Sequence, residues 1–221
     1  MITMTLEELI AINGLLDQKA IEGIIIKPST KSEAERLENI NESLTKKGLL
    51  IEGQLTDTFL ATTELLKRYK ASDKKIFINN LRIALVDEAY AIVLELLPND
   101  AISFSYVPRI TILKKYIEAS HLLKQEQKPT FFSYDITTCT TDEYKADLDR
   151  KTWTNLMVIQ TYIKGRLSKY LTYYFDEEEA YCFNHLKKTK QQRGANDFRL
   201  DLAQLLDEEE EQADETNLTI N

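Results

Sequence analysis

Apolar residues recur every three or four positions in three segments of the N-terminal third, which predicts three amphipathic helices. The first begins near Thr5, the second near Thr30 and the third near Thr56. Thr5, Thr30 and, later in the chain, Thr140 each precede a glutamate by three residues, the spacing of a capping box at a helix start. Gly48 is expected to end the second helix in the left-handed conformation. A β-branched run at residues 21–27 (IEGIIIK) predicts a short buried strand between the first two helices.

The pattern changes after residue 73. Three runs, KKIFINNLRIALV, AYAIVLELL and AISFSYV, are rich in β-branched and aromatic residues and predict an antiparallel meander of three strands. Turn-like residues separate them, first Asp87 and Glu88 and then residues 98–100 (PND). The remainder predicts three helical segments and one strand: helices at 108–124, 140–190 and 197–206, and a strand at 129–138. Runs of strands beside runs of helices indicate an α+β fold rather than a doubly wound α/β sheet.

Length and composition fit one globular domain. The chain has 221 residues, of which 43% are apolar and 29% charged, enough for one sizeable core. We expect a single α+β domain over residues 1–206, with helices and a strand meander at 5–107 and a helical C-terminal half at 108–206. Residues 207–221 are expected to form a disordered acidic tail. Its seven acidic groups account for most of the net charge of −8, and the rest of the chain carries −1.

Targeting signals do not stand out. The N-terminus MITMTLEELIAING has no basic leader, and no apolar run approaches the roughly 20 residues that span a bilayer. Two cysteines in a chain of this length do not indicate a disulfide framework. We therefore expect a cytoplasmic protein.

One metal site can be drawn from the sequence. Cys182 and His185 lie three apart on a predicted helix, and Cys139 and His121 would complete a four-ligand set. This set uses every Cys and His from three separate segments without paired spacing, so scattered residues are the better interpretation. No GxGxxG, GKS or HExxH pattern occurs, and adjacent carboxylates lie in turns or charged runs. We expect no metal, no cofactor and no enzymatic activity.

Nucleic-acid binding is a further alternative. Cations at residues 187–193 form a basic patch, but the acidic tail and the near-neutral body oppose binding to phosphates. A plain alternative is that these cations lie at a helix C-terminus, where the helix dipole favours positive charge. A further hypothesis is that the acidic tail folds back onto this patch. A winged-helix-like regulator would place its recognition helix at 56–70, where the only cations lie at the end of the helix.

Aromatic residues of the predicted C-terminal helices indicate protein binding. Trp153 lies on the apolar stripe and fits the core, whereas Tyr162 and Tyr173 lie off it. Aromatic side chains with a polar tip are common interface anchors. Tyr162 and Tyr173 are therefore candidate protein-binding residues.

The segment SLTKKGLLIEGQLTDTFLATTELLKRY, followed by a strand meander, resembles the EspG family, the cytoplasmic substrate chaperones of type VII (ESX) secretion. Gly48, Leu49, Gly53 and Leu55 match its GL-x-x-x-G-x-L joint between two helices. The likeness is closer to the Firmicute, EsaE-like version, and the composition is typical of a low-GC Gram-positive bacterium.

The resemblance implies a central antiparallel or mixed sheet with N-terminal helices and a C-terminal helical bundle. It also implies binding of helical WXG- or LXG-type secretion substrates, without ATP or any cofactor. The family's docking surface involves a loop between early meander strands and the helical bundle. These map to Asp87 and Glu88 and to the region around Trp153 and Met157.

Overall fold

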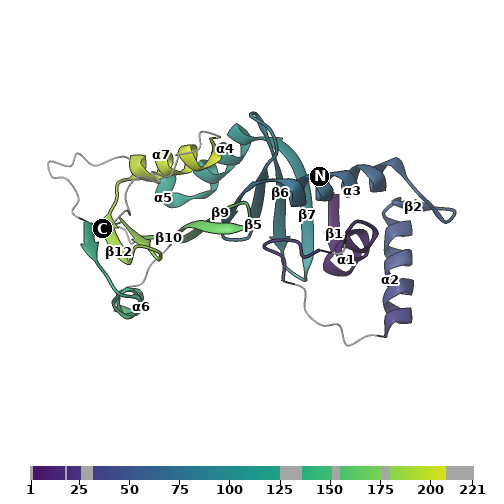
Figure 1. Ribbon diagram of the computed structural model, residues 1–221, viewed down its shortest axis with the longest axis horizontal. Coiled ribbons are helices and arrows are strands. Elements are labelled where there is room, and N and C mark those ends of the chain that lie inside the picture. The colour runs from purple at the N-terminus through teal and green to yellow at the C-terminus, as the bar shows by residue number, and fades with distance from the viewer. Residues whose placement is uncertain are drawn as a thin grey trace, which may run out of the picture.

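The fold is built on one ten-stranded sheet that runs the length of the molecule (Figure 1). The computed structural model describes residues 2–17, 19–25, 32–124, 136–150, 155–175 and 180–207. Its helices are α1 (Leu6–Leu15), α2 (Glu33–Lys46), α3 (Asp57–Ala71), α4 (Arg109–Ala119), α5 (His121–Lys124), α6 (Thr141–Arg150) and α7 (Ala195–Leu206). Its strands are β1 (Ile2–Thr5), β2 (Leu50–Ile51), β3 (Gln54–Leu55), β4 (Lys74–Ile78), β5 (Leu81–Leu85), β6 (Tyr90–Leu97), β7 (Ala101–Pro108), β8 (Ile136–Thr138), β9 (Asn155–Ile163), β10 (Arg166–Phe175), β11 (Ala180–Asn184) and β12 (Thr189–Gln192). The strand order is β1-β7-β6-β5-β4-β9-β10-β11-β12-β8, and β2 and β3 form a separate hairpin.

The two halves of the sheet repeat one arrangement. Each half begins with a strand and a helix, β1–α1 or β8–α6, continues through a four-strand meander, and ends in a helix, α4 or α7. The first strand pairs antiparallel with the last strand of its own meander, β1 with β7 and β8 with β12. The halves join where β4 and β9 pair antiparallel. The fold therefore has an internal pseudo-twofold relation, in which α4 and α7 occupy equivalent places.

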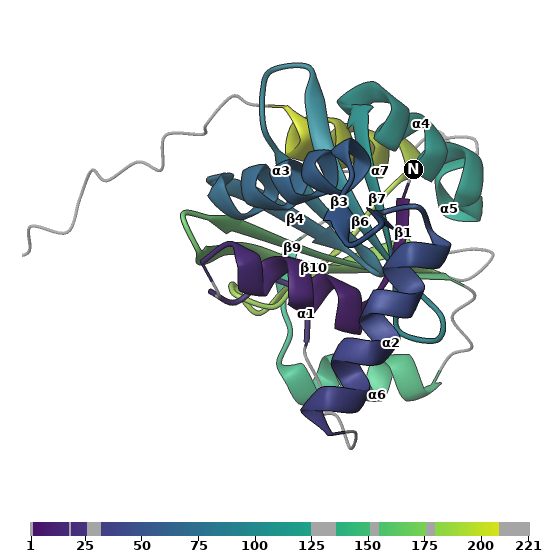
Figure 2. The same cartoon turned by 90° about the vertical axis from the view of Figure 1, so that its right-hand side faces the viewer.

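Helices cover both faces of the sheet. In both views α4 and α7 lie together on one side, with α6 on the other (Figures 1 and 2). One apolar cluster joins the sheet to α4, α5 and α7, and a second joins β1 and β5–β7 to α1, α2 and α3. A small third cluster lies beneath α6. The α+β class with a large antiparallel sheet is thus confirmed.

The joint between α2 and α3 follows from local sequence. Gly48, at a φ of 66°, ends α2, and the N–H of Leu49 donates to the carbonyl of Leu44 at 2.8 Å, as in a Schellman stop. The β2–β3 hairpin turns through Gly53, at a φ of 77°. Thr56 then caps α3, as expected, by accepting a backbone N–H through its side chain.

The N-terminal half differs from the sequence prediction in three places. The second capping box is Ser32 with Glu35, whereas Thr30 lies outside the described residues. The strand predicted at 21–27 is wrong for residues 21–25, which form a turn and irregular backbone, and residues 26–31 lie outside the described part. The meander has four strands, because Asn79 adopts a left-handed φ of 48° and turns the first predicted run back on itself.

The helix predicted over residues 140–190 is wrong beyond Arg150. Residues 155–192 form strands β9–β12, so the C-terminal half is only partly helical. Val, Ile, Thr, Tyr and Phe dominate this segment, and these residues favour strands. The apolar residues that traced a helical stripe instead lie on both faces of the sheet, with Met157 against α7's cluster and Tyr174 against α6's. The tail from residue 208 onward lies outside the described residues.

Candidate protein-binding site

Asp87 fastens the turn between β5 and β6. Its Oδ1 accepts the backbone N–H groups of Ala89 at 3.0 Å and Tyr90 at 2.7 Å, and its Oδ2 accepts the hydroxyl of Tyr106 at 2.9 Å. The Arg68 guanidinium lies 3.6 Å from Oδ2. Desolvation acts to raise the pKa of Asp87, but these hydrogen bonds and the arginine outweigh it and hold the pKa below its ordinary value.

Two exposed tyrosines, Tyr90 and Tyr106, stack on each other beside this turn. The rings of Tyr90 and Tyr106 stack with centroids 4.9 Å apart, and each residue remains about two-fifths exposed. Arg68 lies over the Tyr106 ring at 5.0 Å. We call Arg68, Asp87, Tyr90 and Tyr106 the tyrosine cluster. Sequence reasoning identified Asp87 but missed the two tyrosines. Tyr90 begins β6 directly after the predicted turn at Asp87 and Glu88, whereas Tyr106 lies within β7. Glu88 is exposed next to the cluster.

The other predicted binding residues lie apart from the turn. Trp153 lies outside the described residues. Tyr173 is 1% exposed and belongs to the core beneath α7, so its ring is not available as a surface anchor. Tyr162 is half-buried, with its ring centroid 4.8 Å from that of Phe77. Met157 is buried at the start of β9 and contributes to a cavity.

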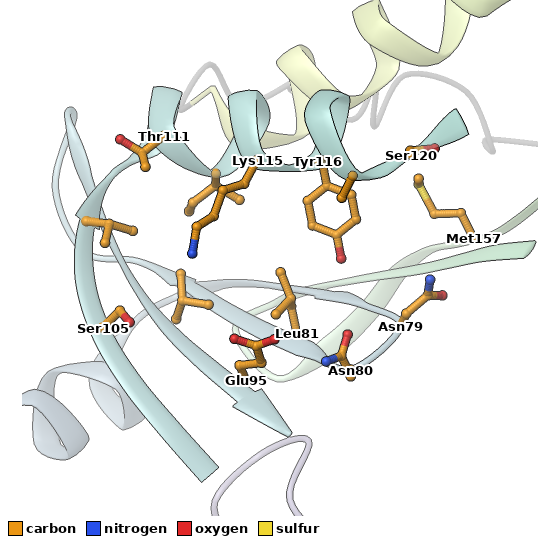
Figure 3. A pocket seen from close by; sticks show the side chains of 14 residues that line it. Asn79, Asn80, Leu81, Glu95, Ser105, Thr111, Lys115, Tyr116, Ser120 and Met157 are labelled. Atoms are coloured by element: carbon orange, nitrogen blue, oxygen red, sulfur yellow. The ribbon is translucent and has the colours of Figure 1, made fainter. Parts of the chain in front are cut away.

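That cavity lies between α4 and strands β5–β7 and has a volume of about 350 Å³ (Figure 3). Leu81, Val93 and Val107 line it from the strands, Tyr116 from the helix, and Met157 from β9. The Tyr116 hydroxyl donates to the carbonyl of Ile78 at 3.2 Å, and burial raises its pKa. A cavity of this size, lined by apolar side chains together with polar groups, is typical of binding sites. Met157 and Asp87 are not brought together, because they lie near opposite ends of β5, roughly 15 Å apart by strand length.

The α4 side of the cavity carries both apolar and polar side chains. Ile112 and Tyr116 line the cavity together with Thr111, Lys115 and Ala119. Figure 3 shows Thr111, Lys115 and Tyr116 on α4 above the strands. In the second half, α7 packs Phe198, Leu202 and Leu205 against the sheet.

Two opposite charges lie at the edge of this cavity. Figure 3 shows the Lys115 ammonium reaching down from α4 and the Glu95 carboxylate facing it from β6. Within the described part of the chain, neither side chain forms an ion pair. Both charges are therefore available to a bound partner.

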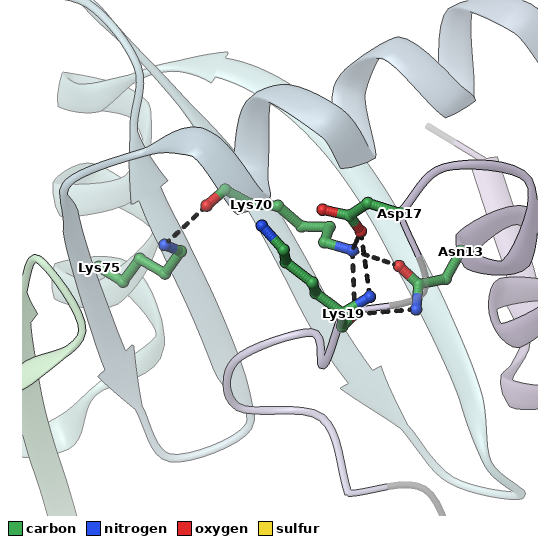
Figure 4. Close-up of polar contacts among 5 residues, drawn as sticks. All are labelled: Asn13, Asp17, Lys19, Lys70 and Lys75. Atoms are coloured by element: carbon green, nitrogen blue, oxygen red, sulfur yellow. Dashed lines mark hydrogen bonds and ion pairs between the residues drawn. The ribbon is translucent and has the colours of Figure 1, made fainter.

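A third polar group, around Lys70, is structural. Its Nζ donates to the Asn13 side chain at 2.6 Å, to the Lys19 carbonyl at 2.9 Å, and to the Asp17 carboxylate (Figure 4). The Lys70 side chain is 11% exposed. These bonds fasten the end of α3 to the loop after α1. Asp17, Lys19 and Lys70 also border a second cavity of about 820 Å³. Its charged lining includes four lysines, among them Lys75, and the carboxylates of Asp17 and Glu22.

The cysteines and histidines do not assemble. Cys182 faces α7, whereas His185 stacks on Tyr170 on the other face of the sheet, since residues three apart on a strand point in opposite directions. Cys139 is buried beneath α6. The side chain of His121 lies outside the described part, and in the remainder no three His, Cys, Asp or Glu residues are grouped to hold a metal. Burial raises the pKa of the Cys182 thiol to about 12, which disfavours the nucleophilic thiolate at neutral pH.

The family model of DUF5081, a domain of unknown function, matches residues 2–196. The chain belongs to the DUF5081 family. Comparison with curated protein sequences found no match. None of the described helices of this DUF5081 chain is long and apolar enough to cross a membrane.

Among solved structures, the DUF5081 chain is similar to the Mycobacterium tuberculosis type VII secretion system chaperone EspG5 in complex with the PE25–PPE41 dimer. The TM-score is 0.56 at 9% sequence identity, over 93% of this chain and 95% of that chain. At this identity the likeness shows the fold alone, and it confirms the fold expected from the EspG resemblance. The Firmicute, EsaE-like subtype stays a prediction.

Proposed function

We propose that this DUF5081 protein is a cytoplasmic chaperone or adaptor that binds a helical substrate of a type VII secretion system in a Gram-positive bacterium. The supporting observation is the fold, which matches over 93% of its length a chaperone solved with a PE25–PPE41 dimer. The WXG or LXG class of the substrate rests on the sequence resemblance. Such a protein covers an apolar part of its client until export, and it needs no cofactor and catalyses no reaction.

The cavity beneath α4 is the proposed client site. Apolar side chains from one face of a client helix would enter between α4 and the strands, against Val93, Val107 and Met157. Burial of such anchors supplies most of the affinity in protein interfaces, and charges at the rim supply orientation. Lys115 and Glu95 provide one rim charge of each sign.

The tyrosine cluster fits this role less well. The carboxylate of Asp87 is already bonded to Tyr106 and to its own turn, and Arg68 already lies against both. A partner there would have to replace satisfied contacts. The cavity, in contrast, offers uncovered apolar surface and charges without a described partner.

The packing of α3 argues against the alternative of a winged-helix-like regulator. The helix that would read DNA, α3, buries Phe59, Leu66 and Tyr69 against the sheet. Its exposed side carries Glu64 beside Lys67, at 3.6 Å, which is not a phosphate-binding surface.

Co-expression tests the proposal. The chain and a helical WXG- or LXG-type protein encoded nearby should elute together from gel filtration as a stoichiometric complex. Lys115→Glu should weaken this complex about fivefold if one rim ion pair is reversed. Lys114→Glu is the matched control, because Lys114 carries the same charge on the same helix, is 75% exposed and does not line the cavity. Absence of a complex with every neighbouring helical client would overturn the proposal.

A further inference from the structure

Positive side chains gather at one end of the sheet, around the start of β4. Lys74 and Lys75 begin β4, and Lys164 and Arg166 flank the β9–β10 turn beside it. The N–H of Lys164 donates to the Asp73 carbonyl at 2.7 Å, which holds this turn against the start of β4. On the other side of β4 lies the lysine-lined cavity, bordered by Lys19 (Figure 4). We call this surface the cationic end.

Only some of these charges are neutralised. Lys75 lies 3.2 Å from Glu22, and Lys70 is bonded to Asp17. Lys19, Lys164 and Arg166 form no ion pair within the ranges that the structure describes. This excess of positive charge is local. The whole chain has a net charge of −8, and without the seven acidic residues of its tail the net charge is −1.

The chain leaves α7 at this same end. The Lys74 ammonium donates to the carbonyl of Asp207 at 2.5 Å, and the Arg109 guanidinium donates to the carbonyl of Leu206 at 3.1 Å. The next eight residues, 208–215 (EEEEQADE), lie outside the described part and carry six carboxylates. A high density of negative charge therefore begins beside Lys74.

We propose that the cationic end is a binding site for an acidic peptide segment, and that its occupant is residues 208–215 of this chain. Charge complementarity supports the pairing, and the exit of α7 beside Lys74 makes the encounter intramolecular. Eight extended residues reach about 27 Å, which is far enough to pass the β9–β10 turn and the lysine-lined cavity.

The patch at residues 187–193 is a poorer site for the same segment. It lies on β12 and the turn before it, four strands from β4 and so about 19 Å across the sheet. Two of its cations are engaged, Lys190 with Asp147 at 2.6 Å and Arg193 with Asp201 at 3.3 Å. The fold-back onto this patch that the sequence suggested is therefore replaced by binding at the cationic end.

Carboxyl-to-amine crosslinking of the full chain tests the proposal, because a zero-length crosslinker joins groups already in contact. At low salt, residues 208–215 should crosslink to Lys19, Lys74 or Lys164, and these crosslinks should fade above about 0.5 M salt, where exposed charges are screened. Crosslinks only to the patch at 187–193, or to no lysine, would overturn the site.

A pair of charge reversals sharpens the test. Lys164→Glu with Arg166→Glu should make cleavage of the tail by a glutamate-specific protease about tenfold faster, given two exposed ion pairs. Lys187→Glu with Lys188→Glu changes the net charge equally and should leave cleavage unchanged. Thermal unfolding of all three proteins checks that folding is intact. Equal cleavage rates in folded wild type and both variants would refute the proposal, and no client enters the experiment, so its outcome is independent of the chaperone function.

Discussion

Filling the cavity beneath α4 should separate stability from client binding. Ser105 lies on β7 opposite Val93, lines the cavity, and makes no side-chain hydrogen bond to the described residues. Phenylalanine is favoured in strands. A cavity of about 150 Å³ is known to accept benzene, so 350 Å³ accepts the ring of a Ser105→Phe variant.

The magnitude follows from burial. A fully buried phenylalanine side chain contributes about 3 kcal/mol, and a ring in an open cavity recovers roughly half of this. Loss of rotamer freedom costs about 0.5 kcal/mol, which leaves a stabilisation of about 1 kcal/mol. For a chain of this length, the melting temperature should rise by about 2–4 °C.

Two assays on the same samples decide the outcome. Thermal unfolding should show the small rise, and gel filtration with the client should show at least a tenfold loss of complex, because the ring occupies the place of the client's anchors. Gln192→Phe, which puts the same ring on an exposed position of β12, is the control and should retain binding. A stable Ser105→Phe protein that binds its client normally would refute the cavity as the client site.

Three further predictions concern the fold. Glu8 accepts a hydrogen bond from Lys47 at 2.6 Å. Burial acts to raise the pKa of Glu8, but its hydrogen bonds outweigh burial and lower the pKa. The carboxylate therefore stabilises the folded state at neutral pH, and this stabilisation is lost as the pH falls through the folded-state pKa. Glu8→Gln should cost about 2 kcal/mol at pH 7, with the difference from wild type closing in acid, as followed by urea unfolding; a pH-independent difference would contradict this. Gly23 has a φ of 81°, and a Cβ added there would lie 2.5 Å from Cδ of Arg82. Gly23→Ala should therefore lower the free energy of unfolding by about 3 kcal/mol in the same urea assay. Gly14→Ala is the control and should be neutral or stabilising, because a Cβ on this residue of α1 meets open space. Tyr173→Ala should cost about 3–5 kcal/mol in thermal unfolding as a core truncation, and a loss below 1 kcal/mol would show that the ring is not core.

Local chemistry explains which elements the sequence could predict. The capping boxes at Thr5 and Thr140 and the stop at Gly48 depend on residues within one helical turn, and all three occur as expected. Strand β9 pairs instead with β4, more than 75 residues away in sequence, and a local pattern does not contain this pairing. The helical interpretation also overlooked local signals, namely the β-favouring residues of this segment and the turn at Lys164 and Gly165, both with positive φ.

The candidate site also combines features that local sequence predicts with features that depend on long-range packing. Asp87 could be placed in a turn from its neighbours, and Met157, which the sequence placed in a helix, lies on β9 and lines the cavity. The cavity itself depends on how α4 lies over β5–β7, and its helix face of Thr111, Lys115 and Ala119 resembles an ordinary solvent-exposed surface in sequence. An empty space between elements leaves no periodic signal.

Hydrogen exchange of the free chain and of its complex with the client tests the central claim most directly. The account predicts slower exchange on binding in α4 and in strands β6 and β7, with the β5–β6 turn at Asp87 unchanged. Slower exchange confined to that turn, with α4 unaffected, would contradict it.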